Sequence, residues 1–311
     1  MKVFCSNEKL GVRPYAHYIG KLCSNFFRGK GGEGRMKHIV EVEWLQANLN
    51  DENICIIDTR FQLGDPKAGL NDYVKGHIPG AIYFDLEKDL SGKVQQHGGR
   101  HPLPMLEEFV DKLSAAGIDH NAKVVIYDDQ HGAMASRLWW MLKFLGHELV
   151  FVLNGGFSKW CQSSLPTNSE VPIVNKKVFV PNIQDNMHIS MEEVKERIQQ
   201  QVSLFLDSRE EKRYLGIEEP IDRVAGHIPT AKHAFWKDSL SSDGTWKSKL
   251  EQEARFSTLQ KETEIIVYCG SGVTACPNIL ALYEADFSNV KLYVGSWSDW
   301  ISYPENEIEL N

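Results

Sequence analysis

The chain contains an internal repeat, which limits the folds open to it more than any other feature does. The segment ICIIDTR ends at Arg60 and returns as SLFLDSR, which ends at Arg209. GHIPGA begins at Gly76 and returns as GHIPTA at Gly226. Further on, VVIYDD and NGGFSKW return in the same order as IIVYCG and VGSWSDW. Four matches in one order indicate a tandem duplication, so each half of the chain forms a unit of its own.

Each half alternates short β-branched segments with helical segments. Gly, Asp or Pro bounds the β-branched runs, as is typical of buried strands, and the alternation predicts an α/β fold in which helices flank a parallel sheet. Ser190 and Glu193 have the spacing of a capping box at the start of the helix MEEVKERIQQ. In the first half we expect a helix over residues 133–145 that stops at Gly146.

Two domains joined by a linker follow from this pattern. A chain of 311 residues is long enough for about two domains of ordinary size. We expect the first domain over residues 36–165 and the second over residues 188–311. Residues 166–187 contain three prolines and have no helical period, which is typical of a linker.

Residues 1–35 differ from the rest of the chain. They contain seven Lys or Arg, two acidic residues and no sustained periodicity, which predicts a disordered extension. A basic, acid-poor segment also suits a transit peptide. A third interpretation is that translation starts at Met36, because GGEGR just before it back-translates into purine-rich codons like those of a bacterial ribosome-binding site.

Composition and charge exclude several classes of protein. The chain has no apolar stretch long enough to span a membrane and no signal-type segment, so we expect a cytoplasmic protein without a membrane partner. A net charge of −8 leaves no basic field for nucleic acid. The six cysteines include no C-x-x-C pair, which argues for reduced thiols rather than zinc ligands or disulfides. We expect neither a metal nor a cofactor.

Cys269 stands where a predicted strand meets a loop of small residues and then a helix. The loop consists of Gly270, Ser271, Gly272, Val273, Thr274 and Ala275. Small residues let successive backbone N–H groups curl around the cysteine sulfur, with the positive end of the helix dipole behind them. Such a cradle stabilises a thiolate, which is the nucleophilic form of cysteine. The repeat puts Asp128 at the matching position, in the bulkier loop YDDQHGAMASR, so we expect only the second loop to form a cradle.

These motifs resemble the rhodanese family of sulfurtransferases over nearly all of the chain from Met36 onward. The resemblance rests on the two GHIP motifs, DTR and DSR, CGSGVTA and GSWSDW. It implies an inactive first domain and an active second one, in which Cys269 alternates between a thiolate and a persulfide. The loop is similar to that of the family members that use 3-mercaptopyruvate. Members that use thiosulfate typically carry an Arg-Lys pair where this chain has Gly270 and Ser271.

The resemblance also implies residues that bind the donor. Similar enzymes hold the substrate carboxylate with two arginines before the second GHIP motif, and the candidates are Arg213 and Arg223. A planar guanidinium suits this role because it binds a carboxylate through two hydrogen bonds. The loop residues around the sulfur complete the predicted binding set: Gly270, Gly272, Val273 and Thr274.

A relay of serine, histidine and acid is implied for the proton of the donor thiol. Ser271 matches the serine and His101 the histidine, and the acid is Glu87, with Asp85 nearby. His97 competes with His101, because the stretch HGGRHPLP contains both. If this relay forms, the site lies between the two domains.

We therefore predict an enzyme that moves sulfur from 3-mercaptopyruvate through a Cys269 persulfide to an acceptor. The acceptor is cyanide or a thiol, such as thioredoxin or a low-molecular-weight thiol. The alternative is a thiosulfate sulfurtransferase with the same mechanism. A non-enzymatic redox or partner-binding module, with Cys276 resolving an oxidised Cys269, stays open as well. A cysteine phosphatase is excluded, because the loop closes at Ala275 without the arginine that holds phosphate.

Overall fold

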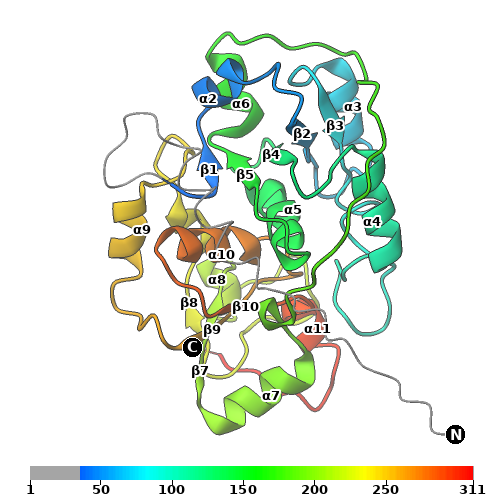
Figure 1. Ribbon diagram of the computed structural model, residues 1–311. Coiled ribbons are helices and arrows are strands. Elements are labelled where there is room, and N and C mark those ends of the chain that lie inside the picture. The colour runs from blue at the N-terminus through cyan, green and yellow to red at the C-terminus, as the bar shows by residue number, and fades with distance from the viewer. Residues whose placement is uncertain (1–35, 311) are drawn as a thin grey trace, which may run out of the picture. The chain divides into compact units, whose positions relative to one another are not determined.

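The computed structural model describes residues 36–310, and the expectations for residues 1–35 lie outside this range. Two five-stranded sheets form the framework, with strand orders β1-β5-β4-β2-β3 and β6-β10-β9-β7-β8. Every strand pair in both sheets is parallel, and helices flank the sheets (Figure 1). The predicted α/β fold with one parallel sheet in each half is therefore confirmed.

The elements of the first half follow the predicted alternation. Its strands are β1 (Ile39–Val40), β2 (Ile54–Asp58), β3 (Ala81–Tyr83), β4 (Lys123–Tyr127) and β5 (Val150–Leu153). Its helices are α2 (Val42–Ala47), α3 (Ala68–Lys75), α4 (Leu106–Ala115), α5 (Ala133–Phe144) and α6 (Gly156–Gln162).

The second half repeats the plan after a short 3-10 helix, η1 (Asp185–Met187). Its strands are β6 (His188–Ile189), β7 (Ser203–Asp207), β8 (Lys232–His233), β9 (Glu264–Tyr268) and β10 (Val290–Tyr293). Its helices are α7 (Met191–Gln200), α8 (Glu211–Tyr214), η2 (Trp236–Ser239), α9 (Lys249–Arg255), α10 (Ala275–Glu284) and α11 (Ser296–Trp300). None of the helices within residues 36–310 is long and apolar enough to cross a membrane.

Local sequence signals explain where two of these helices begin or end. At the start of α7, Oγ of Ser190 accepts a hydrogen bond from the Glu193 amide at 3.2 Å, and the Glu193 carboxylate accepts one from the Ser190 amide at 2.9 Å. The predicted capping box is thus confirmed. Helix α5 ends just before Gly146, whose φ of +77° is the left-handed conformation that terminates many helices.

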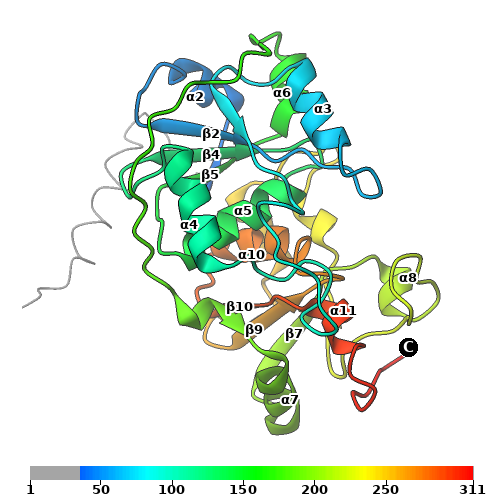
Figure 2. The same ribbon diagram turned by 90° about the vertical axis from the view of Figure 1, so that its right-hand side faces the viewer.

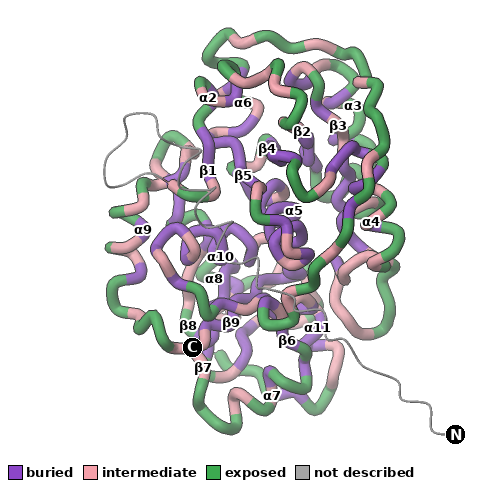
Figure 3. The backbone as a smooth tube through the Cα atoms, viewed as in Figure 1, coloured by how far each residue is buried: buried purple, intermediate pink, exposed green. Residues whose placement is uncertain are grey.

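Helices α5 and α10 are the equivalent helices of the two repeats, and they pack against each other. Figures 1 and 2 both show them side by side, between the two sheets. Trp139 and Leu142 of α5 belong to the same buried cluster as Ile279 and Leu282 of α10. Figure 3 shows both helices as largely buried. A continuous apolar core therefore joins the halves, so residues of the first half are held close to the loop that opens α10.

The segment between the halves is attached to the first half. Residues 164–184 contain no helix or strand. The backbone of Asn168 pairs with that of His77, the Lys177 amide donates to the Ser114 carbonyl at 3.0 Å, and the Asn182 amide donates to the Leu145 carbonyl at 2.9 Å. These hydrogen bonds hold the segment along the surface rather than leaving it as a free tether.

Candidate active site

Cys269 follows β9 directly, at the carboxyl edge of the second sheet, and is only 1% exposed. Its amide donates to Oγ of Ser296 at 3.1 Å, and its carbonyl accepts from the Trp297 amide at 2.9 Å. The Gly270 carbonyl accepts from the Ser298 amide at 2.9 Å. The GSWSDW motif therefore fixes the start of the cysteine loop through α11. The carboxyl edge of a parallel sheet is where α/β proteins commonly bind ligands.

The loop needs glycine at position 272. Gly272 has a φ of +76°, and a Cβ atom there would lie 2.2 Å from the Val294 carbonyl oxygen. Its own carbonyl accepts a hydrogen bond of 3.1 Å from Nη1 of Arg137 on α5. Beyond it, Val273 is buried and Thr274 is the N-cap residue of α10. The first half of the chain thus contributes a buried guanidinium that supports the loop of the second half.

The first half also forms an anion cradle, so the expectation that only the second loop does so is wrong. Oδ1 of Asp128 accepts from the amides of Gln130 at 2.9 Å and Gly132 at 2.8 Å. Oδ2 accepts from the amides of Met134 at 2.7 Å and Ala135 at 2.9 Å. The loop backbone, not the bulk of its side chains, aims these amides inward. The repeat equates this position with Cys269, whose loop likewise leads from a strand into a helix, α10.

His101 and Ser271 come together from different halves. Nδ1 of His101 lies 2.8 Å from Oγ of Ser271, and both residues are buried. Burial, together with the nearby positive charges of Arg137 and Arg100, lowers the pKa of His101 to about 4. At neutral pH this imidazole is therefore neutral, and it can exchange a proton with the serine hydroxyl.

The segment that carries His101 is fastened to α11. The Gly98 amide donates to Oδ1 of Asp299 at 2.7 Å, and the Arg100 amide donates to Oγ of Ser298 at 3.1 Å. Gly99 has a φ of +80°, and a Cβ there would lie 2.4 Å from the Gly295 carbonyl oxygen. The two glycines of HGGRH thus allow the close approach that brings His101 to the cysteine loop.

The other predicted members of the relay lie elsewhere. The Glu87 side chain is exposed, and its amide donates to Oδ1 of Asp85 at 2.9 Å. His97 stacks on Tyr303, with Nδ1 2.7 Å from Oγ of Ser302. Of the carboxylates within residues 36–310, none contacts the His101 imidazole. The structure therefore brings together a serine–histidine pair and does not bring Glu87 to it.

Two guanidinium groups face Gly270, the residue after Cys269. A Cβ built on Gly270 would lie 2.9 Å from Nη2 of Arg100 and 3.3 Å from Nη2 of Arg213. One of them, Arg213, is a candidate from the sequence and lies on α8. Arg100 was missed, although the sequence places it directly before His101. The exposed Arg223 instead donates from Nη2 to the Ile301 carbonyl, at the end of α11. We define Arg100 and Arg213 as the arginine clamp.

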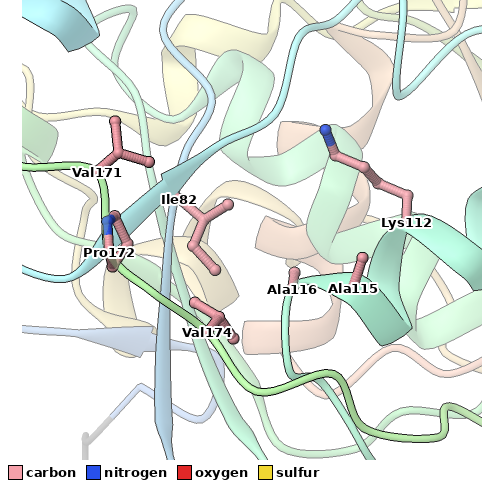
Figure 4. Close-up of a pocket in the computed structure, with 7 residues that line it drawn as sticks. All are labelled: Ile82, Lys112, Ala115, Ala116, Val171, Pro172 and Val174. Carbon is pink, nitrogen blue, oxygen red and sulfur yellow. The ribbon is translucent and has the colours of Figure 1, made fainter.

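A separate cavity of about 240 Å³ lies between β3, α4 and the linker (Figure 4). It is lined mainly by apolar side chains: Ile82, Ala115, Ala116, Val171, Pro172 and Val174, with Lys112 at one side. None of these residues belongs to the cysteine loop or the arginine clamp. In the part of the chain that the structure describes, no cluster of three or more His, Cys, Asp or Glu could hold a metal ion.

Comparison with known proteins agrees with this arrangement. A family model for the rhodanese-like domain matches residues 41–163 and 190–303. The chain belongs to the rhodanese family. It is 39% identical over 275 residues to a probable 3-mercaptopyruvate sulfurtransferase from Pseudomonas aeruginosa, covering 87% of this chain and 97% of the relative. It is 32% identical to a thiosulfate sulfurtransferase from Cricetulus griseus, covering 84% of this chain and 91% of the relative.

Solved structures of the rhodanese family share the fold. SseA from Escherichia coli, described as a 3-mercaptopyruvate sulfotransferase, superposes with a TM-score of 0.74 at 31% identity, covering 84% of this chain and 98% of that one. The 3-mercaptopyruvate sulfurtransferase from Leishmania major gives a TM-score of 0.73 at 29% identity, covering 87% of this chain and 75% of that one. The predicted family and the predicted class of enzyme, a sulfurtransferase, are confirmed.

Proposed function

We propose that this sulfurtransferase takes sulfur from 3-mercaptopyruvate, releases pyruvate, and passes the sulfur from a Cys269 persulfide to a thiol or cyanide. One observation carries the proposal: the arginine clamp and the His101–Ser271 pair flank the same cysteine loop. A donor that has both a carboxylate and a carbon needing protonation uses both features. The P. aeruginosa relative, named a probable 3-mercaptopyruvate sulfurtransferase, supports this choice of donor.

The first half-reaction breaks the carbon–sulfur bond of the donor. The Cys269 thiolate attacks the donor sulfur, and the electron pair of the C–S bond moves onto carbon to give the enolate of pyruvate. The thiol proton of the donor passes through Ser271 and the neutral His101 to that carbon. The products are pyruvate and a persulfide anion on Cys269, whose charge the loop amides stabilise.

The arginine clamp orients the donor for this attack. Each guanidinium donates hydrogen bonds to one carboxylate, which fixes the direction in which the thiol of the donor points. Arg213 comes from the second half and Arg100 from the first. Residues 188–311 therefore act as the catalytic domain, and residues 36–165 supply Arg100, His101 and Arg137 without a nucleophile of their own.

The second half-reaction regenerates the enzyme. A thiolate or cyanide attacks the outer sulfur of the persulfide, and the Cys269 thiolate leaves. The class of acceptor is a small thiol or a thioredoxin-like protein thiol. We place this cycle in the cytoplasm, because it needs a reduced Cys269 at the start of each turnover.

Thiosulfate is the second candidate donor, since the relative from C. griseus is named a thiosulfate sulfurtransferase. Gly270 and Ser271 argue against it, because neither adds a positive charge to those of the arginine clamp, and thiosulfate is a dianion. Measuring kcat/KM for both donors on one preparation tests the choice. A higher value for mercaptopyruvate, with one added sulfur on the Cys269 peptide by mass spectrometry, supports the proposal. A higher value for thiosulfate contradicts it.

A further inference from the structure

The arginine clamp already holds a carboxylate, and that carboxylate belongs to the chain. Oδ1 of Asp222 pairs with Nη1 of Arg100, and Oδ2 lies 3.0 Å from Nη2 of Arg213. Oδ2 would also lie 3.6 Å from a Cβ built on Gly270. The Asp222 side chain is 5% exposed. One carboxylate thus bridges both guanidinium groups, directly beside the residue that follows the nucleophile.

The charges around the arginine clamp balance while Asp222 is in place. Arg213 pairs with Glu219 as well as Asp222, whereas Asp222 is the carboxylate that pairs with Arg100 within the described residues. Arg209 lies beside the same group and also pairs with Glu219, but its charge is balanced by Asp207, which accepts three hydrogen bonds from its side chain. The two positive charges of the arginine clamp are therefore balanced by the negative charges of Asp222 and Glu219. This group has no net charge to attract an anionic donor.

Asp222 lies on a segment without helix or strand, residues 215–226. Its amide and that of Ile221 both donate to Oε1 of Glu219, at 3.0 and 3.1 Å. These bonds fix the backbone of the turn, whereas the Asp222 side chain is held by the arginine clamp. Rotation of this side chain can therefore free the clamp while Glu219 keeps Arg213 in position.

We propose that Asp222 occupies the binding site of the donor's carboxylate, so that the carboxylate of a donor binds by displacing the Asp222 side chain from the arginine clamp. This inference rests on the proposed function for the identity of the donor. When the Asp222 side chain leaves, two guanidinium groups and Glu219 remain, and the net charge of this binding site is about +1. A monocarboxylate neutralises this charge, whereas a dianion such as thiosulfate exceeds it. Asp222 is thus a specificity-determining residue that lowers affinity for every anion and disfavours dianions most.

The test measures binding apart from turnover. In a Cys269→Ser background, pyruvate and sulfate are titrated calorimetrically into the protein with Asp222, with Asp222→Asn, and with Glu218→Gln. Glu218 is a matched control, because it lies in the same segment and pairs with Lys212 at the exposed surface. We expect Asp222→Asn to tighten pyruvate binding at least fivefold and sulfate binding by a larger factor. Glu218→Gln should change either affinity less than twofold.

Unchanged or weaker pyruvate binding in Asp222→Asn overturns the exchange, and so does an equal effect of Glu218→Gln. If Asp222→Asn does not fold, Asp222→Ser serves the same comparison with the same expected result. The enzyme with Cys269 separates this inference from the proposed function. Absence of mercaptopyruvate turnover in it contradicts the proposed donor, whereas normal turnover together with unchanged pyruvate binding contradicts only the role of Asp222.

Discussion

Nδ1 of His101 lies 2.8 Å from Oγ of Ser271, although the two residues are 170 positions apart and belong to different repeats. Ser271 follows Cys269 by two positions, and the residues around His101 bind to α11. The proposed active site therefore draws on both halves. In the proposed mechanism the first half supplies the imidazole and one arginine of the clamp.

Replacing His101 with Ala tests this pairing. General acid–base groups contribute about 10²–10⁴-fold, so we expect mercaptopyruvate kcat to fall by about 10²-fold or more. Thiosulfate turnover should change less, because its sulfite leaving group needs no protonation at carbon. His97→Ala is the control, since His97 contacts Ser302 and Tyr303 instead. An equal loss with both donors would show that His101 acts on the structure and not on proton transfer.

The low pKa of His101 also predicts a pH dependence. Burial lowers the pKa of the imidazole to about 4, compared with 6.5 for an ordinary histidine, so the ring stays neutral at any pH well above 4. The contribution of His101 to kcat should therefore be constant between about pH 5 and 8 and decline as the pH falls through about 4. The unfolded chain takes up this proton nearer 6.5, so the free energy of unfolding should decrease as the pH drops from 6.5 to about 4. Urea denaturation of His101→Ala should lack that component.

Cys269→Ser should abolish transfer from every donor, because a serine hydroxyl does not ionise appreciably and cannot carry sulfane sulfur. Cys276→Ser should keep most activity. Burial raises the pKa of Cys276 to about 12, and its thiol donates to the Gly272 carbonyl, a bond that a serine hydroxyl can replace. Mass spectrometry after donor treatment should find the added sulfur on the Cys269 peptide. Sulfur on the exposed Cys161 would refute the assignment.

Arg213→Lys should raise the KM for mercaptopyruvate about tenfold. A lysine keeps the charge but cannot make the paired hydrogen bonds of a guanidinium, and a charge-assisted bond contributes about 1.5–3 kcal/mol. Arg223→Lys is the matched control and should leave KM within twofold, because the exposed Arg223 donates to the Ile301 carbonyl. Steady-state kinetics with mercaptopyruvate give the KM of each variant for this comparison. A larger effect at Arg223 would restore it as the carboxylate ligand.

Two glycine substitutions in the loop should have opposite kinetic signatures. In Gly270→Ala the new Cβ lies against the guanidinium ends of Arg100 and Arg213, at 2.9 and 3.3 Å, so we expect a higher KM with little change in kcat. In Gly272→Ala the Cβ meets the Val294 carbonyl at 2.2 Å and φ is +76°, so the cradle itself distorts. There kcat should fall at least tenfold. The same change in both variants would mean that the loop moves as one unit.

Asp128→Cys, combined with Cys269→Ser, should not recover sulfur transfer. Asp128 is fully buried, and Trp246 of the second half lies over the loop, 3.0 Å from a Cβ built on Gly132. Access rather than the lack of a cradle prevents a reaction there. The substitution also leaves four amides without their carboxylate, and each unsatisfied buried group costs about 1–3 kcal/mol. The midpoint of urea unfolding should therefore drop, and measurable transfer in the double variant would disprove the argument.

Local patterns in the sequence were enough to predict the two parallel sheets, the Cys269 loop and the capping box of α7. Each depends on residues that are neighbours along the chain: alternating strand and helix periods, a run of small residues, and Ser190 three positions before Glu193. Arg213 and the pairing of His101 with Ser271 came from a family resemblance rather than from a local pattern.

Only the tertiary structure identified Arg100 and Asp222 as partners, because their 122-residue separation is bridged by packing of one half on the other. Packing likewise left Glu87 in solvent and directed Arg223 to Ile301. The cradle around Asp128 was missed for a different reason. Its amides point inward because His131 and Gly132 adopt φ values of 59° and 87°. The prediction was based on the size of the side chains, which does not determine the direction of the backbone amides.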